Sequence, residues 1–155
     1  KMPNPHQFKL SLNWELKEKP ANRSVRYYIK SHQISISGKE LLNVSAAKIF
    51  KGDPLLFNPE DLLLASLTSY HMMSYLYCCD MNQIEVISYT DHSEAFLKVN
   101  EDGSGKIEKV ILKPVVVIND KSKLELANSL HTEANKLCFI ANSCNFEIEH
   151  YPISS

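Results

Sequence analysis

Four cysteines carry the most reactive side chains of this 155-residue chain: Cys78, Cys79, Cys138 and Cys144. Two of them are adjacent and the other two are separated by five residues. These spacings match neither the disulfide framework of a small secreted domain nor a zinc knuckle. We therefore expect four reduced thiols, with Cys78 and Cys79 as small core residues near the end of a helix.

Histidine and glutamate side chains are the other candidates for chemistry. Metal-ligand spacing such as His-Glu-x-x-His does not occur, so we expect no metal and no cofactor. His71 is typical of a hydrogen-bonded core histidine. His131 lies seven residues before Cys138 on the same helical face, but about 10 Å away, which is too far for a direct base contact. Glu60 suits a helix start, where a carboxylate stabilises the dipole, and a catalytic role for it is equally open.

The composition excludes several classes of function. The chain has 17 Lys plus Arg and 18 Asp plus Glu, and its two arginines are Arg23 and Arg26. It therefore lacks the basic surface and the guanidinium groups that nucleic-acid binding needs. The longest apolar stretch, Leu62–Leu67, is far shorter than the roughly 20 residues of a membrane span. Without an apolar signal core near the start, we expect a cytoplasmic protein with neither nucleic-acid nor membrane partners.

Alternating apolar residues predict three strands in the first part of the chain. Residues 8–16 alternate with a period of two, which is typical of a half-buried strand. A second alternating run follows over residues 25–36 and approaches a turn at Gly38. Residues 41–45 can return as a third strand, and a loop at Gly52-Asp53-Pro54 closes this segment.

The next segment has the start signals of a helix. Asn58 can cap it, Pro59 suits the first helical position, and acidic residues follow. We expect a helix from about Pro59 to about Cys79. Its apolar residues lie on nearly every side, so neighbours should bury it in the centre of the molecule.

Three segments rich in β-branched and aromatic residues follow the helix: residues 84–90, 95–99 and 106–118. Asp102-Gly103-Ser104-Gly105 predicts a tight turn between the last two, so we expect antiparallel strands. The capping-box pattern of Ser122 and Glu125 predicts a second, amphipathic helix up to about Cys138. Residues 146–151 should form a final strand. This order indicates one α+β domain over residues 1–155, with antiparallel sheets wrapped around the buried helix.

The segment from Asn58 to Met73, read together with residues 138–143, resembles the OsmC/Ohr family of osmotically inducible and organic-hydroperoxide-resistance proteins. The resemblance covers most of the chain and includes the order of strands and the turns at Gly38 and Gly103. It implies an intertwined homodimer. It also implies a buried helix that carries a peroxide-attacking cysteine ten residues after the glutamate of Asn-Pro-Glu.

This resemblance assigns candidate site residues. Tyr70 occupies the place of the nucleophilic cysteine, Cys138 matches the second, resolving cysteine, and Glu60 matches the glutamate. The family usually adds an arginine on an early strand, and Lys30 or His32 is nearest to that place as a substitute cation. Glu60 and Tyr70 lie about 15 Å apart on one straight helix, so chain folding or a second subunit would have to bring them together.

Replacing the nucleophilic thiol with a phenol changes the expected chemistry. Tyrosine has an ordinary pKa of roughly 10 and forms no sulfenic acid, so the two-cysteine peroxidase cycle should be absent. Our leading hypothesis is a family member that binds a small apolar or oxidised molecule at the dimer interface. Tyr70, His71 and Met73 would contact this ligand, with Met72, Tyr75 and Tyr77 as further lining residues.

Two alternatives remain open. The first is an enzyme: a one-cysteine thiol peroxidase or reductase of organic hydroperoxides that uses Cys138, with Lys30 or another cation lowering the thiol pKa. The second is a purely structural or interaction protein that has neither ligand nor turnover. Side chains filling the space beside Tyr70 would favour this last class.

Overall fold

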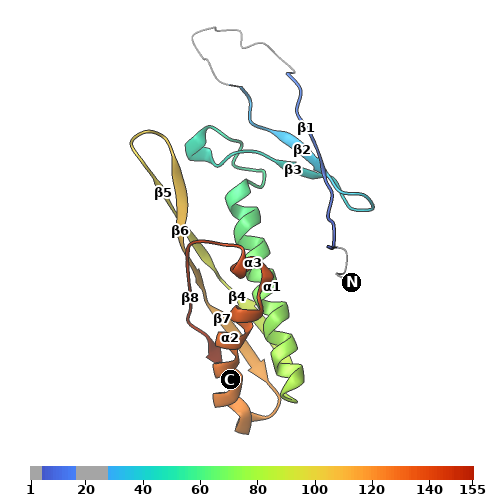
Figure 1. The fold of residues 1–155 in the computed structure, drawn as a ribbon, viewed down its shortest axis with the longest axis vertical. Helices are drawn as coiled ribbons and strands as arrows, with labels where there is room; N and C mark the ends of the chain where they lie inside the picture. Colours follow the sequence, from blue (N-terminus) through green and yellow to red (C-terminus); the bar gives the residue numbers. More distant parts are fainter. Residues whose placement is uncertain (1–4, 17–27) are drawn as a thin grey trace. The chain divides into compact units, whose positions relative to one another are not determined.

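The computed structural model describes residues 5–16 and 28–155. The chain divides into two compact units, Lys1–Leu62 and Leu63–Ser155, and each is described by itself (Figure 1). Whether the chain folds as the single domain expected from the sequence stays a prediction.

The first unit contains a three-stranded antiparallel sheet. Its strands are β1 (Ser11–Asn13), β2 (His32–Ser35) and β3 (Leu42–Val44), in the spatial order β1-β2-β3. Gly38 turns the chain between β2 and β3 with a φ of 79°, a value that glycine adopts without steric cost. The first and third strands and this turn confirm the sequence predictions. Part of the second alternating run, with Arg23 and Arg26 close by, lies outside the described residues.

The first strand is more exposed than the alternation predicted. All three residues of β1 are exposed, and Leu12 keeps 60% of its surface accessible, so the half-buried strand is a wrong prediction for this unit. Burial occurs instead at Val44 and Ser45, because the loop after the 3-10 helix η1 (Lys48–Phe50) returns to β3. There, Ser45 N donates to Phe57 O at 2.8 Å and Asp53 N donates to Ser45 Oγ at 3.0 Å.

Helix α1 (Pro59–Met81) begins at the predicted residue and ends two residues later than expected. Asn58 caps it: Asp61 N donates to Asn58 Oδ1 at 2.8 Å, and Asn58 N donates back to Asp61 Oδ2 at 3.3 Å. One side of the helix is buried, but an opposite stripe is exposed. The stripe's large apolar residues are Met73, Leu76, Tyr77 and Met81. The prediction that neighbours bury nearly every side is therefore confirmed only in part.

The second unit contains two three-stranded sheets. One sheet has the order β4-β7-β9, from β4 (Val86–Asp91), β7 (Pro114–Ile118) and β9 (Ile153–Ser154). The other has the order β5-β6-β8, from β5 (Glu94–Val99), β6 (Gly105–Leu112) and β8 (Glu147–His150). The predicted hairpin turn at Gly103, with a φ of 88°, joins β5 and β6.

Two features of these sheets differ from the prediction. The segment expected as one strand over residues 106–118 is divided at Lys113, because Pro114 has no N–H for a ladder, and its halves join different sheets. The expected antiparallel arrangement holds for β4 with β7 and for β5 with β6. The strands after the second helix pair parallel, β8 with β6 and β9 with β7, so both sheets are mixed.

Helix α2 (Leu124–Leu137) confirms the second predicted helix, although its start differs. Asp120, rather than Ser122, acts as the cap: its side chain accepts Ser122 N and begins the 3-10 helix η2 (Lys121–Lys123), which leads into α2. A one-turn helix, α3 (Phe139–Asn142), follows directly. The predicted capping box at Ser122 is therefore wrong by two residues.

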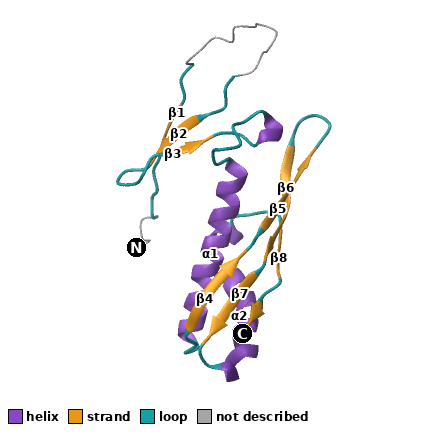
Figure 2. Ribbon diagram, turned by 180° about the vertical axis from the view of Figure 1, so that it is seen from behind, coloured by secondary structure: helices purple, strands orange, loops and turns teal. Residues whose placement is uncertain are grey.

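Two apolar clusters hold the second unit together. The first joins the later half of α1 to α2 and the β4-β7-β9 sheet, around Tyr75, Val116 and Ala134. The second joins Leu67 of α1 to β6 and to Cys138, and β5, β8 and α3 pack against it. Figure 2 shows both sheets running beside α1. Strands and helices thus share one core in this unit, which confirms the α+β class.

Candidate functional site

Tyr70 lies beside the buried cluster that contains Cys138. This cluster consists of Leu67, Val110, Leu112 and Cys138, and the half-buried Tyr70 packs against it. The Tyr70 ring also lies 5.2 Å, centroid to centroid, from the ring of Phe139, at the start of α3. Tyr70 and Cys138, which the family resemblance assigned to one site, are therefore neighbours in one cluster. Phe139 is largely exposed, so this aromatic pair reaches the surface of the unit.

The Cys138 thiol is sealed inside the unit. Its side chain is 0% exposed, and its Sγ accepts a hydrogen bond from Ala141 N at 3.4 Å, which caps α3. Cys78 and Cys79 are buried, and Cys144 is half-buried. Burial raises the pKa of all three of these thiols. All four cysteines are free, as the spacings predicted.

Three histidines from three elements gather in the interior of the second unit. His71 Nε2 of α1 lies 3.0 Å from His131 Nδ1 of α2, and their rings stack at 5.3 Å between centroids. The His150 ring of β8 lies 6.1 Å from the His71 ring and 6.4 Å from the His131 ring. His71 and His131 are fully buried. We call these three residues the histidine cluster.

The histidine cluster is held in its neutral form. Burial lowers the pKa of His71 to about 4, and the nearby His150 contributes. Burial lowers the pKa of His131 to about 3, with His71 and His150 adding to the effect, and it also lowers the pKa of His150. Because a buried imidazolium would lose its hydration beside other histidines, the charged form is disfavoured.

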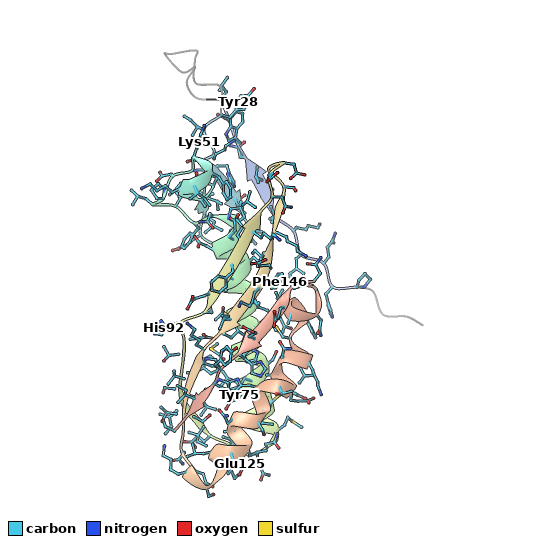
Figure 3. The ribbon with its side chains drawn as sticks, turned by 90° about the vertical axis from the view of Figure 1, so that its left-hand side faces the viewer. Tyr28, Lys51, Tyr75, His92, Glu125 and Phe146 are labelled. Carbon is cyan, nitrogen blue, oxygen red and sulfur yellow. The ribbon has the colours of Figure 1, made fainter. Side chains whose placement is uncertain are left out.

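Tyr75 packs against the histidine cluster. Its ring stacks on His131 at 3.9 Å between centroids, and its hydroxyl donates to Ala127 O of α2 at 2.9 Å. It points into the interior of the second unit (Figure 3), where burial raises its pKa. Tyr75 is therefore a core residue and lines no surface pocket with Tyr70.

The other candidate residues occupy different places. His71 points into the histidine cluster, and Met73 is exposed on α1, so the two do not share a surface. Glu60, Lys30 and His32 belong to the first unit. The Glu60 Oε2 oxygen is buried and has no hydrogen-bond donor among the described residues. Lys30 is exposed, and its carbonyl accepts His32 Nδ1 at 2.7 Å.

Among the described residues, no group of three or more His, Cys, Asp or Glu side chains has the geometry of a metal site. Nor does any helix in residues 5–16 and 28–155 have the length and apolar character needed to cross a membrane.

Sequence reasoning missed the histidine cluster. It considered His71 and His131 separately and gave His150 no role, because the three lie on elements far apart in the chain. The buried side of each helix carries one histidine, and this placement was visible in the sequence. Their meeting was not, because it depends on how α2 packs against α1.

Comparison with known proteins identifies a family and several similar structures. The OsmC family profile, described as OsmC-like protein, matches residues 51–150. An OsmC-like protein of unknown function from Vibrio cholerae has a TM-score of 0.83 and 29% identity, covering 96% of this chain and 100% of that one. Comparison with curated proteins gave no match.

Two organic hydroperoxide resistance proteins share the fold at lower identity. The one from Elizabethkingia anophelis has a TM-score of 0.71 and 16% identity, with 99% of each chain covered. OhrB of Bacillus subtilis has a TM-score of 0.63 and 16% identity, covering 97% of this chain and 98% of that one. At such identities the likeness concerns the fold alone.

Proposed function

The chain belongs to the OsmC-like protein family, and from this premise we propose that it binds a small apolar or oxidised organic molecule beside Tyr70. In this proposal it does not turn over hydroperoxides with two thiols. The observation that carries the proposal is the pairing of a phenol, Tyr70, with a sealed thiol, Cys138, at one apolar cluster.

The chemistry of Tyr70 supports binding over peroxide reduction. Attack on a peroxide needs a thiolate, which becomes a sulfenic acid that a second thiol resolves. A phenol cannot enter this cycle, but it offers an aromatic face and one hydrogen bond. With Phe139 beside it, Tyr70 provides a partly exposed aromatic pair, which suits an apolar molecule that carries one polar group.

One-cysteine peroxidase activity through Cys138 is the second candidate. The hydrogen bond from Ala141 N to Cys138 Sγ favours it, because an N–H donor stabilises a thiolate. Complete burial of the same side chain opposes it, since a peroxide must reach the sulfur. We therefore rank this function second.

Glu60 is proposed to pair with a cationic side chain within the first unit. A buried carboxylate oxygen without a donor is costly, and a cationic side chain is the usual remedy. Lys30 was the substitute suggested by the sequence. Glu60→Gln should remove this ion pair and lower the stability of the first unit, whereas Glu40→Gln, at an exposed position of the same unit, should leave it unchanged.

We further propose that the protein acts as a homodimer. Met73, Leu76, Tyr77 and Met81 form an exposed apolar stripe on α1. A second copy of the chain would remove this stripe from water, which favours association. Sedimentation velocity should give twice the 17.7 kDa chain mass, and Leu76→Glu should shift the protein toward monomer.

A hydroperoxide assay tests the absence of turnover. We expect no saturable consumption of cumene hydroperoxide by the unmodified chain with a dithiol donor. Tyr70→Cys should restore turnover, because it returns a thiol to the place beside Cys138. The matched control is Tyr151→Cys, which adds a thiol at an exposed tyrosine of the same unit and should remain inactive.

Titration with oleic acid and cumyl alcohol tests binding. Tyr70→Ala should lower the affinity for the bound probe by roughly tenfold, the size expected for a lost aromatic contact and hydrogen bond. Tyr151→Ala should leave it unchanged. Efficient turnover by the unmodified chain that disappears in Cys138→Ser would replace the proposal with the second candidate. Neither turnover nor binding would leave only a structural role.

A further inference from the structure

We propose that His71, His131 and His150 form an acid-sensitive latch that holds helix α2 against α1 and thereby controls access to the Cys138 thiol. This inference concerns regulation of the fold and does not depend on the ligand proposed above. It follows from the hydrogen bonding of the cluster, from the groups around it and from the position of Cys138.

The hydrogen bond between the two rings cannot form when both rings are protonated. In the neutral pair, one of the two nitrogens, His71 Nε2 or His131 Nδ1, carries a hydrogen and donates to the other. The outer nitrogens, His71 Nδ1 and His131 Nε2, are buried and have no partner among the described residues. An added proton would make a second N–H donor without an acceptor, inside a site without water contact.

The groups that face the pair supply no compensating negative charge. From α1 come His71 and Tyr75, from α2 His131, from β4 Tyr89, and from β8 His150. Burial raises the pKa of both tyrosines, so they stay neutral. The half-buried carboxylate of Asp91 on β4 acts on Tyr89. The charged groups that act on His71 and His131 are other histidines, so protonation brings like charges together.

Helix α2 is the element most easily displaced when the histidine pair is protonated. The strands around it are held by backbone ladders, β8 to β6 and β9 to β7. Side-chain hydrogen bonds hold α2 itself: the histidine pair, Tyr75 to Ala127 O, and Ser154 Oγ to Asn128 Oδ1 at 3.3 Å. Protonating both rings makes His71 Nε2 and His131 Nδ1 donors and breaks the central one of these bonds, while the ladders of the sheets remain intact.

Movement of α2 would expose Cys138. This residue directly follows the last residue of α2 and caps α3. Its side chain is buried against Leu67 of α1 and against Val110 and Leu112 of β6. When α2 separates from α1, the Cys138 thiol loses its contacts with these buried side chains and becomes accessible to solvent. Acid would therefore convert a protected thiol into an accessible one.

Thiol labelling resolved by peptide mass spectrometry tests the latch. The full-length protein is treated with 4,4'-dithiodipyridine between about pH 7.5 and about pH 5. Each rate is divided by that of the same protein unfolded in urea at the same pH, which cancels the intrinsic pH dependence of the thiol. Two protons bound only in the open form should raise the normalised Cys138 rate by roughly a thousandfold, or about thirtyfold for each histidine.

His131→Asn separates the latch from other acid effects. Asn can replace the Nδ1 contact to His71 but does not titrate, so the increase at Cys138 should fall to roughly thirtyfold. The matched control is His92→Asn, an exposed histidine labelled in Figure 3, which should behave like the unmodified chain. Hydrogen exchange of the unmodified chain reports the same opening without any substitution: α2 amides should lose protection in acid before those of β6.

Three outcomes would overturn the proposal. The normalised Cys138 rate could stay flat as the pH falls. It could rise equally in His131→Asn, which would place the acid sensitivity elsewhere. Cys78 and Cys79 of α1 could become reactive together with Cys138, and α2 and β6 could lose protection together, which would indicate unfolding of the whole unit instead of release of α2.

Discussion

Acidification from about pH 7.5 to about pH 5 should lower the free energy of unfolding of the second unit by about 4 kcal/mol. The two fully buried histidines account for this value, and the lowered pKa of His150 adds to the loss. Unfolding returns His71 and His131 to an ordinary pKa of 6.5, whereas in the folded unit the pKa values are about 4 and about 3. Below pH 6.5 the unfolded chain therefore binds protons that the folded unit does not bind. Each pH unit then lowers the free energy of unfolding by about 1.36 kcal/mol per histidine.

The sign and the window follow from these lowered pKa values. Stability is fully present above pH 6.5 and falls as the pH drops, until about pH 4 for His71 and about pH 3 for His131. At pH 5 each histidine contributes a loss of about 2 kcal/mol. Exposed carboxylates such as Asp102 and Asp120 have lowered pKa values and titrate below this window. Burial raises the pKa of Asp91, which opposes the loss, because the folded unit binds this proton more readily than the unfolded chain.

Urea unfolding followed by far-ultraviolet circular dichroism measures this loss. Helices α1 and α2 dominate that signal and lie mostly in the second unit, whereas the single tryptophan, Trp14, belongs to the first. His131→Asn should halve the loss to about 2 kcal/mol, and His92→Asn should not change it. A loss below about 1 kcal/mol in the unmodified chain would refute the assigned burial of neutral histidines.

Three further substitutions should change stability, each measured by the same urea unfolding at neutral pH. Asn58→Ala removes the side chain that accepts Asp61 N and should cost about 1 kcal/mol, whereas no measurable cost would contradict the capping role. Leu112→Ala empties a fully buried position of the second cluster and should cost about 2–5 kcal/mol; a smaller cost would mean that this cluster is loosely packed. Gly103→Ala places a side chain at a φ of 88° and should cost about 1–2 kcal/mol, although nothing lies within 4 Å of the added carbon, so an unchanged stability would contradict the turn geometry.

Local signals in the sequence were sufficient to predict most of the elements. The Asn58-Pro59 start of α1 and the glycine turns at Gly38 and Gly103 depend on the chemistry of a few adjacent residues. Pairings between distant segments could not be predicted in this way. The parallel pairing of β8 with β6 depends on where the chain returns after α2, and alternation within a strand carries no information about its direction.

Burial was predicted less well than secondary structure. The apolar side chains of β1 and the stripe around Leu76 have the pattern of core residues, yet they are exposed in the single chain. A pattern reports that a side chain avoids water, but not whether its own chain or another molecule covers it. The site shows the same limit: sequence comparison paired Tyr70 with Cys138, but it could not indicate that the thiol is sealed or that His71 faces other histidines.

The protection of the cysteines bears on the proposed loss of peroxide chemistry. A two-thiol cycle needs a thiolate that meets peroxide and a second thiol that can approach it. If Cys138 were to act with a different partner, Cys144 would be the natural choice, because Cys138 acts electrostatically on Cys144. Burial and the neighbouring Cys138 both raise the pKa of Cys144, which makes it a poor nucleophile at neutral pH. The remaining thiols, Cys78 and Cys79, are buried in the other cluster. With a tyrosine at position 70, none of the four described thiols is therefore ready to attack a peroxide. This supports a binding role in which Tyr70 contacts the ligand and Cys138 stays covered until α2 moves.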